Sequence, residues 1–310
     1  MSETGAKAGI GTAASVDVAI QRVRQVYGRW RRNTPVAQMR NDWDELFWSD
    51  AVPADTQYAR IADLEALWIL ADADSGRVLV YLHGGGFKVG SVRSHRDLMA
   101  RISREAGCRV LGVDYRLAPE HRFPAPVQDV VAVYECLLAD GVLPRRVAFA
   151  GDSAGAGLAA SALLALRERG RALPAAVVML SAWTDLTAES ESYTTRAALD
   201  PIHQRPMILA TASNYLGDAD PRQPMASPLF GDLSGLPPLL LQVGGRETVL
   251  DDSTRFAAKA RAAGVEVELE IYDDMIHVFQ QFPDLLPEAR QAIASIGRFL
   301  CRIWNGEVKE

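Results

Sequence analysis

The chain has 310 residues, of which 48% are hydrophobic and 23% are charged, a composition typical of a folded globular protein rather than a disordered one. The formal net charge is −6 at pH 7 and the Lys and Arg residues are scattered, so we expect no nucleic-acid partner. No run approaches the roughly 20 apolar residues that cross a bilayer, and the N-terminal residues lack the pattern of a secretory signal, so we expect a cytoplasmic protein with no membrane span.

The spacing of apolar residues predicts an amphipathic helix over residues 15–30, followed beyond Pro53 by strands that alternate with helices. The expected strands are LEALWIL, RVLVYLH, CRVLGVDY, RRVAFAG, AAVVMLSAW, PLLLQVG and VEVELEIY. The expected helices cover residues 93–106, 126–139, 154–169, 252–263 and 286–304. This alternation predicts an α/β fold in which a mostly parallel sheet is covered by helices on both faces.

Residues 186–227 interrupt the alternation. The segment is rich in Pro, Thr and Ser and has short helical patterns but no clear strand. A segment of this length without a strand is typical of an insertion between two strands of the sheet.

The three cysteines, Cys108, Cys136 and Cys301, have no CxxC spacing, so the sequence indicates neither a disulfide framework nor a zinc site. Each lies among apolar neighbours and is expected to be a buried thiol. We expect no metal and no organic cofactor.

The motif G-x-S-x-G, residues 151–155, lies between an expected strand and an expected helix. A sharp strand-to-helix turn exposes a serine oxygen above the sheet and requires small neighbours, a need that Gly151 and Gly155 meet. A glycine-rich turn could instead bind a phosphate or a dinucleotide, but the spacing matches neither the P-loop nor the Rossmann motif. Ser153 is therefore the candidate nucleophile.

A second motif, HGGGF at residues 83–87, directly follows the strand RVLVYL. Three consecutive glycines cost chain entropy, and they are explained if backbone N–H groups must approach the developing oxyanion of an ester or amide. His83 could act as a base, but its position favours a role in shaping this loop.

The catalytic base is expected late in the chain, because hydrolases of this kind carry serine, acid and histidine in that order. His277 is the last of the five histidines and follows an expected strand. The acid has three candidates after the strand PLLLQVG. Glu247 is nearest the strand end, whereas Asp251 and Asp252 also suit the N-terminus of the next helix, where one of them could serve as a cap.

With these residues in place, the sequence resembles the bacterial hormone-sensitive-lipase-like (family IV) esterases of the α/β-hydrolase superfamily. The motifs HGGGF, DYRLAPEHRFPAP, GDSAG, SAWTDLT and DDMIH match landmarks of that family in its order, over most of the chain. Several separated motifs are more specific than any one of them.

The resemblance implies that the N–H groups of Gly85, Gly86 and Ala154 form the oxyanion hole and that Asp152 supports the turn at Ser153. It also implies a cap over the acyl pocket, made of residues 1–48 and 186–227, on a catalytic domain of residues 49–185 and 228–310. In the family the acid is usually an aspartate about 30 residues before the histidine. Position 247 carries glutamate here, so the resemblance favours Glu247, with Asp251 as the alternative.

The expected activity is hydrolysis of short- to medium-chain carboxylic esters through an acyl-enzyme. Phe87, Tyr193, Ile202 and Met207, with Tyr215, are expected to line the substrate pocket. The alternatives are an amidase, lactonase or lipase with the same triad, or a ligand-binding module like the plant gibberellin receptors, which lack the catalytic histidine. A homodimer through the sheet edge at VEVELEIY is a further possibility.

Overall fold

The computed structural model describes residues 13–49, 51–52, 54–70 and 75–306. At its centre is an eight-stranded sheet in the spatial order β1-β2-β4-β3-β5-β6-β7-β8. The strands from β3 to β8 pair in parallel, whereas β1 and β2 run antiparallel to their neighbours. The strands are β1 (Thr56–Ile61), β2 (Leu64–Ile69), β3 (Val78–Leu82), β4 (Arg109–Val113), β5 (Val147–Asp152), β6 (Val177–Leu180), β7 (Leu239–Gly244) and β8 (Val267–Tyr272).

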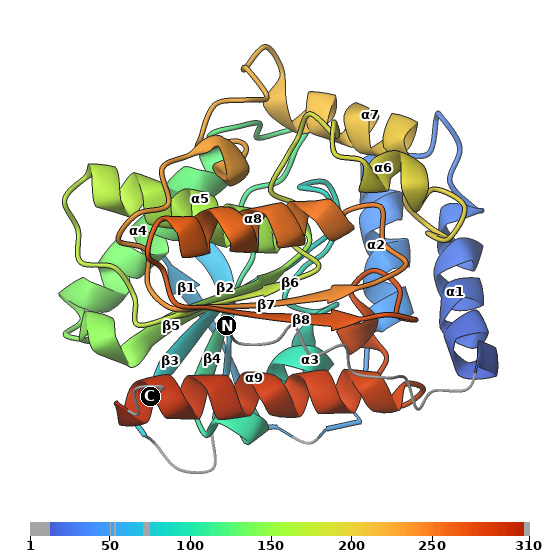
Figure 1. Ribbon diagram of the computed structural model, residues 1–310. Helices are drawn as coiled ribbons and strands as arrows, with labels where there is room; N and C mark the ends of the chain where they lie inside the picture. The colour runs from blue at the N-terminus through green and yellow to red at the C-terminus, as the bar shows by residue number, and fades with distance from the viewer. Residues whose placement is uncertain (1–12, 50, 53, 71–74, 307–310) are drawn as a thin grey trace.

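Helices cover both faces of the sheet, which confirms the predicted α/β class (Figure 1). Helices α3 (Arg96–Ala106) and α9 (Pro287–Asn305) pack together on one face, where they share a buried cluster with the sheet. Helices α4 (Ala125–Ala139), α5 (Ala154–Glu168) and α8 (Leu250–Ala262) pack on the other. No helix in these described ranges is long and apolar enough to cross a membrane.

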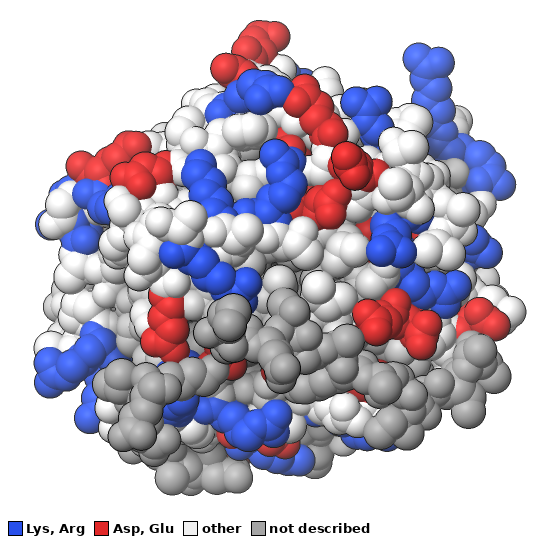
Figure 2. Space-filling view, viewed as in Figure 1, with Lys and Arg blue, Asp and Glu red and all other residues white. Residues whose placement is uncertain are grey.

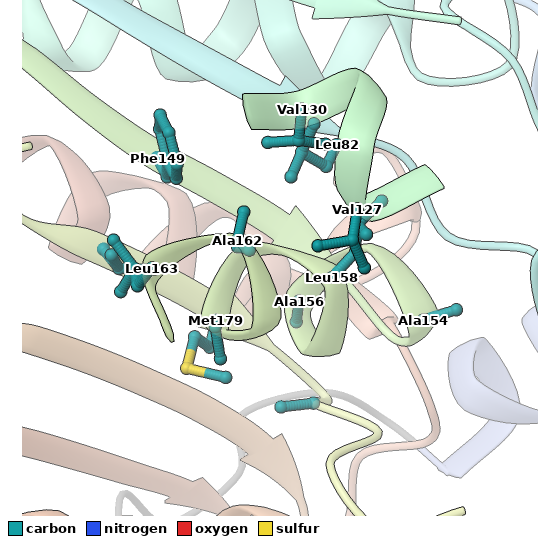
Figure 3. Close-up of a cluster of buried hydrophobic side chains, with 14 of the residues drawn as sticks. Leu82, Val127, Val130, Phe149, Ala154, Ala156, Leu158, Ala162, Leu163 and Met179 are labelled. Atoms are coloured by element: carbon teal, nitrogen blue, oxygen red, sulfur yellow. The ribbon is translucent and has the colours of Figure 1, made fainter. Parts of the chain in front are cut away.

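The elements on either side of Ser153 form the most deeply buried part of the core. Every residue of β5, and α5 from Ala154 to Leu166, is buried. Figure 3 shows side chains of α5, such as Leu158, packed among side chains of β3, β5 and α4, such as Leu82, Phe149 and Val127. Because burial of one such apolar side chain stabilises a fold by about 1.5–3 kcal/mol, the turn at Ser153 is held on a rigid platform.

Four further helices lie outside these layers. Helices α6 (Ser192–Thr195) and α7 (Arg205–Leu216) belong to the expected insertion between β6 and β7. Helices α1 (Ala13–Tyr27) and α2 (Val36–Phe47) precede the sheet and lie on the same side of the molecule as α6 and α7 (Figure 1). Helix α1 packs through Val16, Ala19 and Val23 against the segment that follows β8. Residues 1–12 of the predicted cap lie outside the described residues.

Among the strands and α-helices of the described residues, β1 and α2 were not predicted. Strand β1 is largely exposed and antiparallel, so its residues TQYARI show no apolar face for a pattern to reveal. The N-terminal helix also ends at Tyr27, three residues earlier than expected, and Gly28 follows it.

Of the three free cysteines only Cys108 is buried, whereas Cys136 and Cys301, which we expected to be buried, are half-buried.

Candidate active site

Ser153 lies at a strained turn between β5 and α5. Its backbone has φ 52° and ψ −119°, a conformation that residues other than glycine rarely adopt. A Cβ atom at Gly155 would lie 2.0 Å from the carbonyl oxygen of Leu82, and one at Gly151 would lie 2.6 Å from the carbonyl carbon of Gly155. The glycines of the motif are therefore required by contact, and the turn presents the serine hydroxyl above the carboxyl ends of the strands.

A chain of hydrogen bonds joins three residues from separate loops. The Ser153 hydroxyl lies 2.9 Å from Nε2 of His277, and Nδ1 of His277 lies 2.7 Å from Oε2 of Glu247. With its proton on Nδ1, the imidazole donates to the carboxylate and leaves Nε2 free to accept from the serine. These are the three residues expected from the sequence, and the geometry is that of a nucleophile, a base and an orienting acid.

The carboxylate of Glu247 is fully buried and has defined partners on its second oxygen. Oε1 accepts from the Ser181 hydroxyl at 2.8 Å and from the Gly244 N–H at 2.5 Å. The Ser181 oxygen in turn accepts from the N–H of Val278, the residue after His277. Glutamate is therefore held at both oxygens, and Ser181 connects the acid with the loop that carries His277.

The pKa of His277 is raised above its ordinary value. Burial alone would lower it, but the charge of Glu247 and the hydrogen bond to it, together with the charges of Asp200 and Asp152, outweigh burial. The environment thus favours the positively charged, imidazolium form of His277. A base of this kind works only above its own pKa.

The HGGGF loop lies against the same site. Gly85 and Gly86 line the cavity that contains Ser153 and His277, and both have positive φ, at 115° and 63°. The loop is fixed to the turn at Ser153, because the Gly84 N–H donates to Oδ1 of Asp152 at 3.0 Å. Ala154 is the first residue of α5, where a backbone N–H has no acceptor within the helix. Three N–H groups expected to form an oxyanion hole therefore come from the two segments that flank the serine.

His83 packs against Tyr115 and holds the backbone of the HGGGF loop. Its ring stacks on Tyr115 with centroids 4.4 Å apart, and its Nδ1 donates to the carbonyl oxygen of Gly84 at 2.8 Å. Burial and the neighbouring His95 lower its pKa to about 3. His95 in turn lies 3.2 Å from Oδ1 of Asp152. His83 is not among the residues that line the cavity at Ser153 and instead belongs to a network that holds the loop.

His203, which was not among the expected site residues, contacts the ring of His277. His203 lies between α6 and α7, and its ring meets that of His277 edge to face, with centroids 4.3 Å apart. Its backbone N–H donates to Asp200, whose other oxygen accepts from the N–H and hydroxyl of Thr248, the residue after Glu247. Burial, followed by the charge of His277, lowers the pKa of His203 to about 3. No motif marks His203 in the sequence.

A cavity of about 560 Å³ opens at Ser153 and His277. Two of the expected substrate contacts, Ile202 and Met207, line it. Helices α1 and α2, within the N-terminal region that the resemblance placed in a cap, supply much of its wall, although none of their residues was among the expected substrate contacts. The aromatic residues of this wall are Tyr27, Trp30, Trp43, Phe47, Trp183 and Phe282.

The other expected contacts are not among the residues that line this cavity. Phe87 is buried and stacks on Tyr215, with ring centroids 3.7 Å apart. Tyr193 is buried next to Asp252. Phe87 also lies beside Trp183, so it supports the cavity wall from behind.

The two aspartates considered as alternative acids have other partners. Oδ2 of Asp251 accepts from the N–H of Ser192, and Oδ2 of Asp252 accepts from the N–H groups of Thr184 and Asp185. Both aspartates lie within the first turn of α8, so the expectation that one of them caps this helix is wrong. Instead, they hold the start of the insertion against α8. Within the described part of the chain, no group of three His, Cys, Asp or Glu side chains is arranged to bind a metal.

Comparison with known proteins is consistent with this geometry. A family model described as the α/β-hydrolase fold matches residues 79–281. The chain is 44% identical to an acetyl-hydrolase from Streptomyces hygroscopicus over 89% of this chain and 93% of that protein. It is 39% identical to an esterase from Acinetobacter venetianus over 77% of this chain and 80% of that protein.

Solved structures agree. One is an esterase of the bacterial hormone-sensitive lipase family, which superposes with a TM-score of 0.90 at 46% identity over 95% of this chain and all of that one. Another is the esterase EstE5, with a TM-score of 0.89 at 39% identity over 95% of this chain and all of that one. The chain belongs to the α/β-hydrolase family and, within it, to the serine esterases that resemble bacterial hormone-sensitive lipase.

Proposed function

We propose that the protein hydrolyses carboxylic esters of short to medium acyl chains through the triad Ser153, His277 and Glu247. The observation that carries the proposal is the continuous chain of hydrogen bonds, 2.9 Å from serine to histidine and 2.7 Å from histidine to glutamate. The strained turn at Ser153 and the glycine loop beside it support the same chemistry.

In the first half of the reaction, Nε2 of His277 takes the hydroxyl proton while Oγ of Ser153 attacks the ester carbonyl. The carbonyl oxygen gains the negative charge, and the N–H groups of Gly85, Gly86 and Ala154 stabilise it. The tetrahedral intermediate then expels the alcohol, which takes the proton from His277. The acyl group remains on the serine.

In the second half, His277 takes a proton from water while the water oxygen attacks the acyl-enzyme. A second tetrahedral intermediate expels Ser153, which recovers its proton from His277, and the carboxylic acid leaves. Glu247 keeps the ring in one tautomer and stabilises its positive charge in both halves.

Two observations favour small acyl groups. The Streptomyces hygroscopicus relative is named an acetyl-hydrolase, and the EstE5 crystal was soaked with p-nitrophenyl butyrate. The cavity is bounded on one side by the aromatic residues of α1 and α2, which belong with the insertion to the cap proposed over residues 1–48 and 186–227. A series of p-nitrophenyl esters from acetate to palmitate measures this preference.

The test of the triad is the Ser153→Ala variant assayed with p-nitrophenyl butyrate. We expect a loss of at least about 10³-fold in kcat, because the remaining groups cannot form the acyl-enzyme. Ser161→Ala is the matched control, since Ser161 is a buried serine of α5, the helix that follows Ser153. Near wild-type turnover by Ser153→Ala would reject the assignment, and failure of the wild-type protein to react with a fluorophosphonate would favour the ligand-binding alternative.

A cytoplasmic location and pairing of two copies along β8 stay predictions.

A further inference from the structure

The lining of the active-site cavity carries an excess of positive charge. Arg31, Arg32 and Lys88 line the same cavity as Ser153. The one carboxylate among the described lining residues, Asp152, is already paired with His95 at 3.2 Å. On a chain with net charge −6, this local reversal of sign needs an explanation other than overall composition.

Lys88 is tied directly to the oxyanion loop. Its backbone N–H donates to the carbonyl oxygen of Gly85 at 3.1 Å, and its own carbonyl oxygen accepts from Nε of Arg40 at 3.0 Å. The backbone of Lys88 is therefore fixed three residues after Gly85, at the cavity that Ser153 also lines. Its side chain is half-buried against the cavity.

The surroundings of Lys88 disfavour its positive charge. Burial, followed by the nearby charge of Arg40, lowers the pKa of Lys88. The guanidinium of Arg40 is neutralised by both carboxylate oxygens of Glu120, at 3.0 and 2.7 Å. Among the described residues, no carboxylate lies within ion-pair distance of the Lys88 ammonium, so its charge is free to pair with a bound anion.

The two arginines come from the loop that joins α1 and α2. Arg31 donates to the carbonyl oxygens of Gly28 and Trp30, which holds its guanidinium at the end of α1. Arg32 follows it and is exposed. In Figure 2, Lys and Arg side chains gather at the upper right, where Figure 1 places this loop. The cavity is thus bordered by cations on two separate segments, the oxyanion loop and the α1–α2 loop.

We propose that Lys88, with Arg31 and Arg32, binds an anionic group of the substrate, so that the preferred substrates are esters that carry a carboxylate or phosphate besides the ester bond. An ammonium and planar guanidinium groups provide the donors that such oxygens accept, and the aromatic wall accommodates the apolar part of the same molecule. The inference rests on the proposed function and narrows its substrate class.

The experiment compares matched anionic and neutral esters. On the acyl side, mono-p-nitrophenyl glutarate is compared with p-nitrophenyl pentanoate, which has the same leaving group and acyl length without the carboxylate. On the alcohol side, 4-acetoxybenzoate is compared with its methyl ester. The pair that shows the effect identifies the part of the substrate that carries the anion. The readout is the ratio of kcat/KM for the anionic ester to that for the neutral ester.

We expect Lys88→Met to lower this ratio by about tenfold for at least one pair, the scale of a charge-assisted hydrogen bond. Lys88→Arg should restore most of it. Arg60→Gln is the control, because Arg60 is an exposed cation on β1, away from the cavity. Comparing this ratio between a variant and the wild type cancels both the different intrinsic reactivity of the two esters and any general loss of activity in the variant.

A measurement on the wild-type protein covers the case in which Lys88→Met does not fold. Added NaCl should reduce the anionic-to-neutral ratio, since salt screens partly exposed charges. If the ratio is independent of salt, the inference is refuted. It is also refuted if the ratio is the same in Lys88→Met, Arg60→Gln and the wild type for both pairs, because the cations are then solvated surface charges that do not bind the substrate. If the wild-type protein cleaves neither member of either pair, both the proposed function and this inference are refuted.

Discussion

Replacing Glu247 by glutamine tests the orienting acid, because the structure dictates how the new amide must lie. The Gly244 N–H points at Oε1 from 2.5 Å, and an amide NH₂ in that position would place two donors against each other. The amide oxygen must therefore face Gly244, which leaves the NH₂ facing Nδ1 of His277. That nitrogen then has to accept, so the ring carries its proton on Nε2 and cannot take one from Ser153.

The expected cost is close to that of losing the base. An Asp-to-Asn change that imposes the wrong histidine tautomer in serine proteases lowers kcat by about 10⁴-fold, or about 5.4 kcal/mol of transition-state stabilisation. We expect a loss of that order for Glu247→Gln with p-nitrophenyl butyrate. KM should change little, because Glu247 is fully buried behind His277 and is not among the residues that line the cavity.

Two companion variants separate this mechanism from general damage. Asp251→Asn should keep wild-type turnover within a few-fold, since Asp251 binds the N–H of Ser192 rather than the triad. Glu247→Asp keeps the charge but shortens the side chain by one methylene, so we expect an intermediate loss of about 10- to 100-fold. Turnover by a folded Glu247→Gln within tenfold of wild type would refute the reasoning, and loss in Asp251→Asn alone would transfer the role to Asp251.

Three further predictions concern His277, His83 and Gly155. The charge of Glu247 outweighs burial and raises the pKa of His277, and only the neutral ring can accept the Ser153 proton. We therefore expect kcat/KM to fall as the pH decreases through an apparent pKa above 6.5. A flat profile from pH 5 to 9 would contradict this. The pKa of His83 is about 3 in the folded protein, so between pH 6.5 and 3 this histidine is protonated in the unfolded chain but not in the folded one. The free energy of unfolding should therefore decrease on acidification below pH 6.5, by up to about 1.4 kcal/mol per pH unit. Urea unfolding at several pH values should show a shallower dependence for His83→Asn, and equal slopes would count against the assignment. In Gly155→Ala the new Cβ would lie 2.0 Å from the Leu82 carbonyl oxygen, so we expect a folding defect visible in thermal unfolding, and a melting temperature equal to wild type would show that the turn can relax.

The parts of the site that sequence reasoning could find are those that local structure dictates. A strand, a turn with glycines at fixed positions and a helix require contacts within a few residues, such as the approach of Gly151 to the backbone of Gly155. The order of the triad and the family motifs supplied the partners of Ser153. Fold class followed from the alternation of strands and helices, and the structure confirms it.

The local sequence pattern limited the candidates for the acid of the triad but did not choose between them. Glu247 and Asp251 are four residues apart after the same strand, and both are carboxylates near a helix start. What separates them is where α8 begins and which way its first turn faces. In the structure that turn points Asp251 at Ser192, on the insertion, whereas Glu247 lies before the helix and faces His277.

The cavity wall depended on contacts between distant segments, which periodicity does not record. His203 meets His277 across 74 residues of chain, and Arg40 reaches Lys88 from a helix that the sequence pattern did not reveal. Phe87 was expected to face the substrate because it follows the glycine loop, but its backbone has a positive φ of 59° and its ring stacks in the core on Tyr215. Side-chain direction at such a residue follows from the turn, not from its neighbours in sequence.

The measurement that tests the central claim most directly is detection of the acyl-enzyme itself. The protein is mixed with p-nitrophenyl butyrate, quenched in acid during turnover and digested with trypsin, which releases residues 147–167 as one peptide. That peptide contains Ser153 and Ser161, so fragmentation in the mass spectrometer assigns the site. We predict a butyryl group on Ser153 in the wild type and its accumulation when deacylation is slowed at low pH. A butyryl group on any other residue, or none during measurable turnover, would contradict the account.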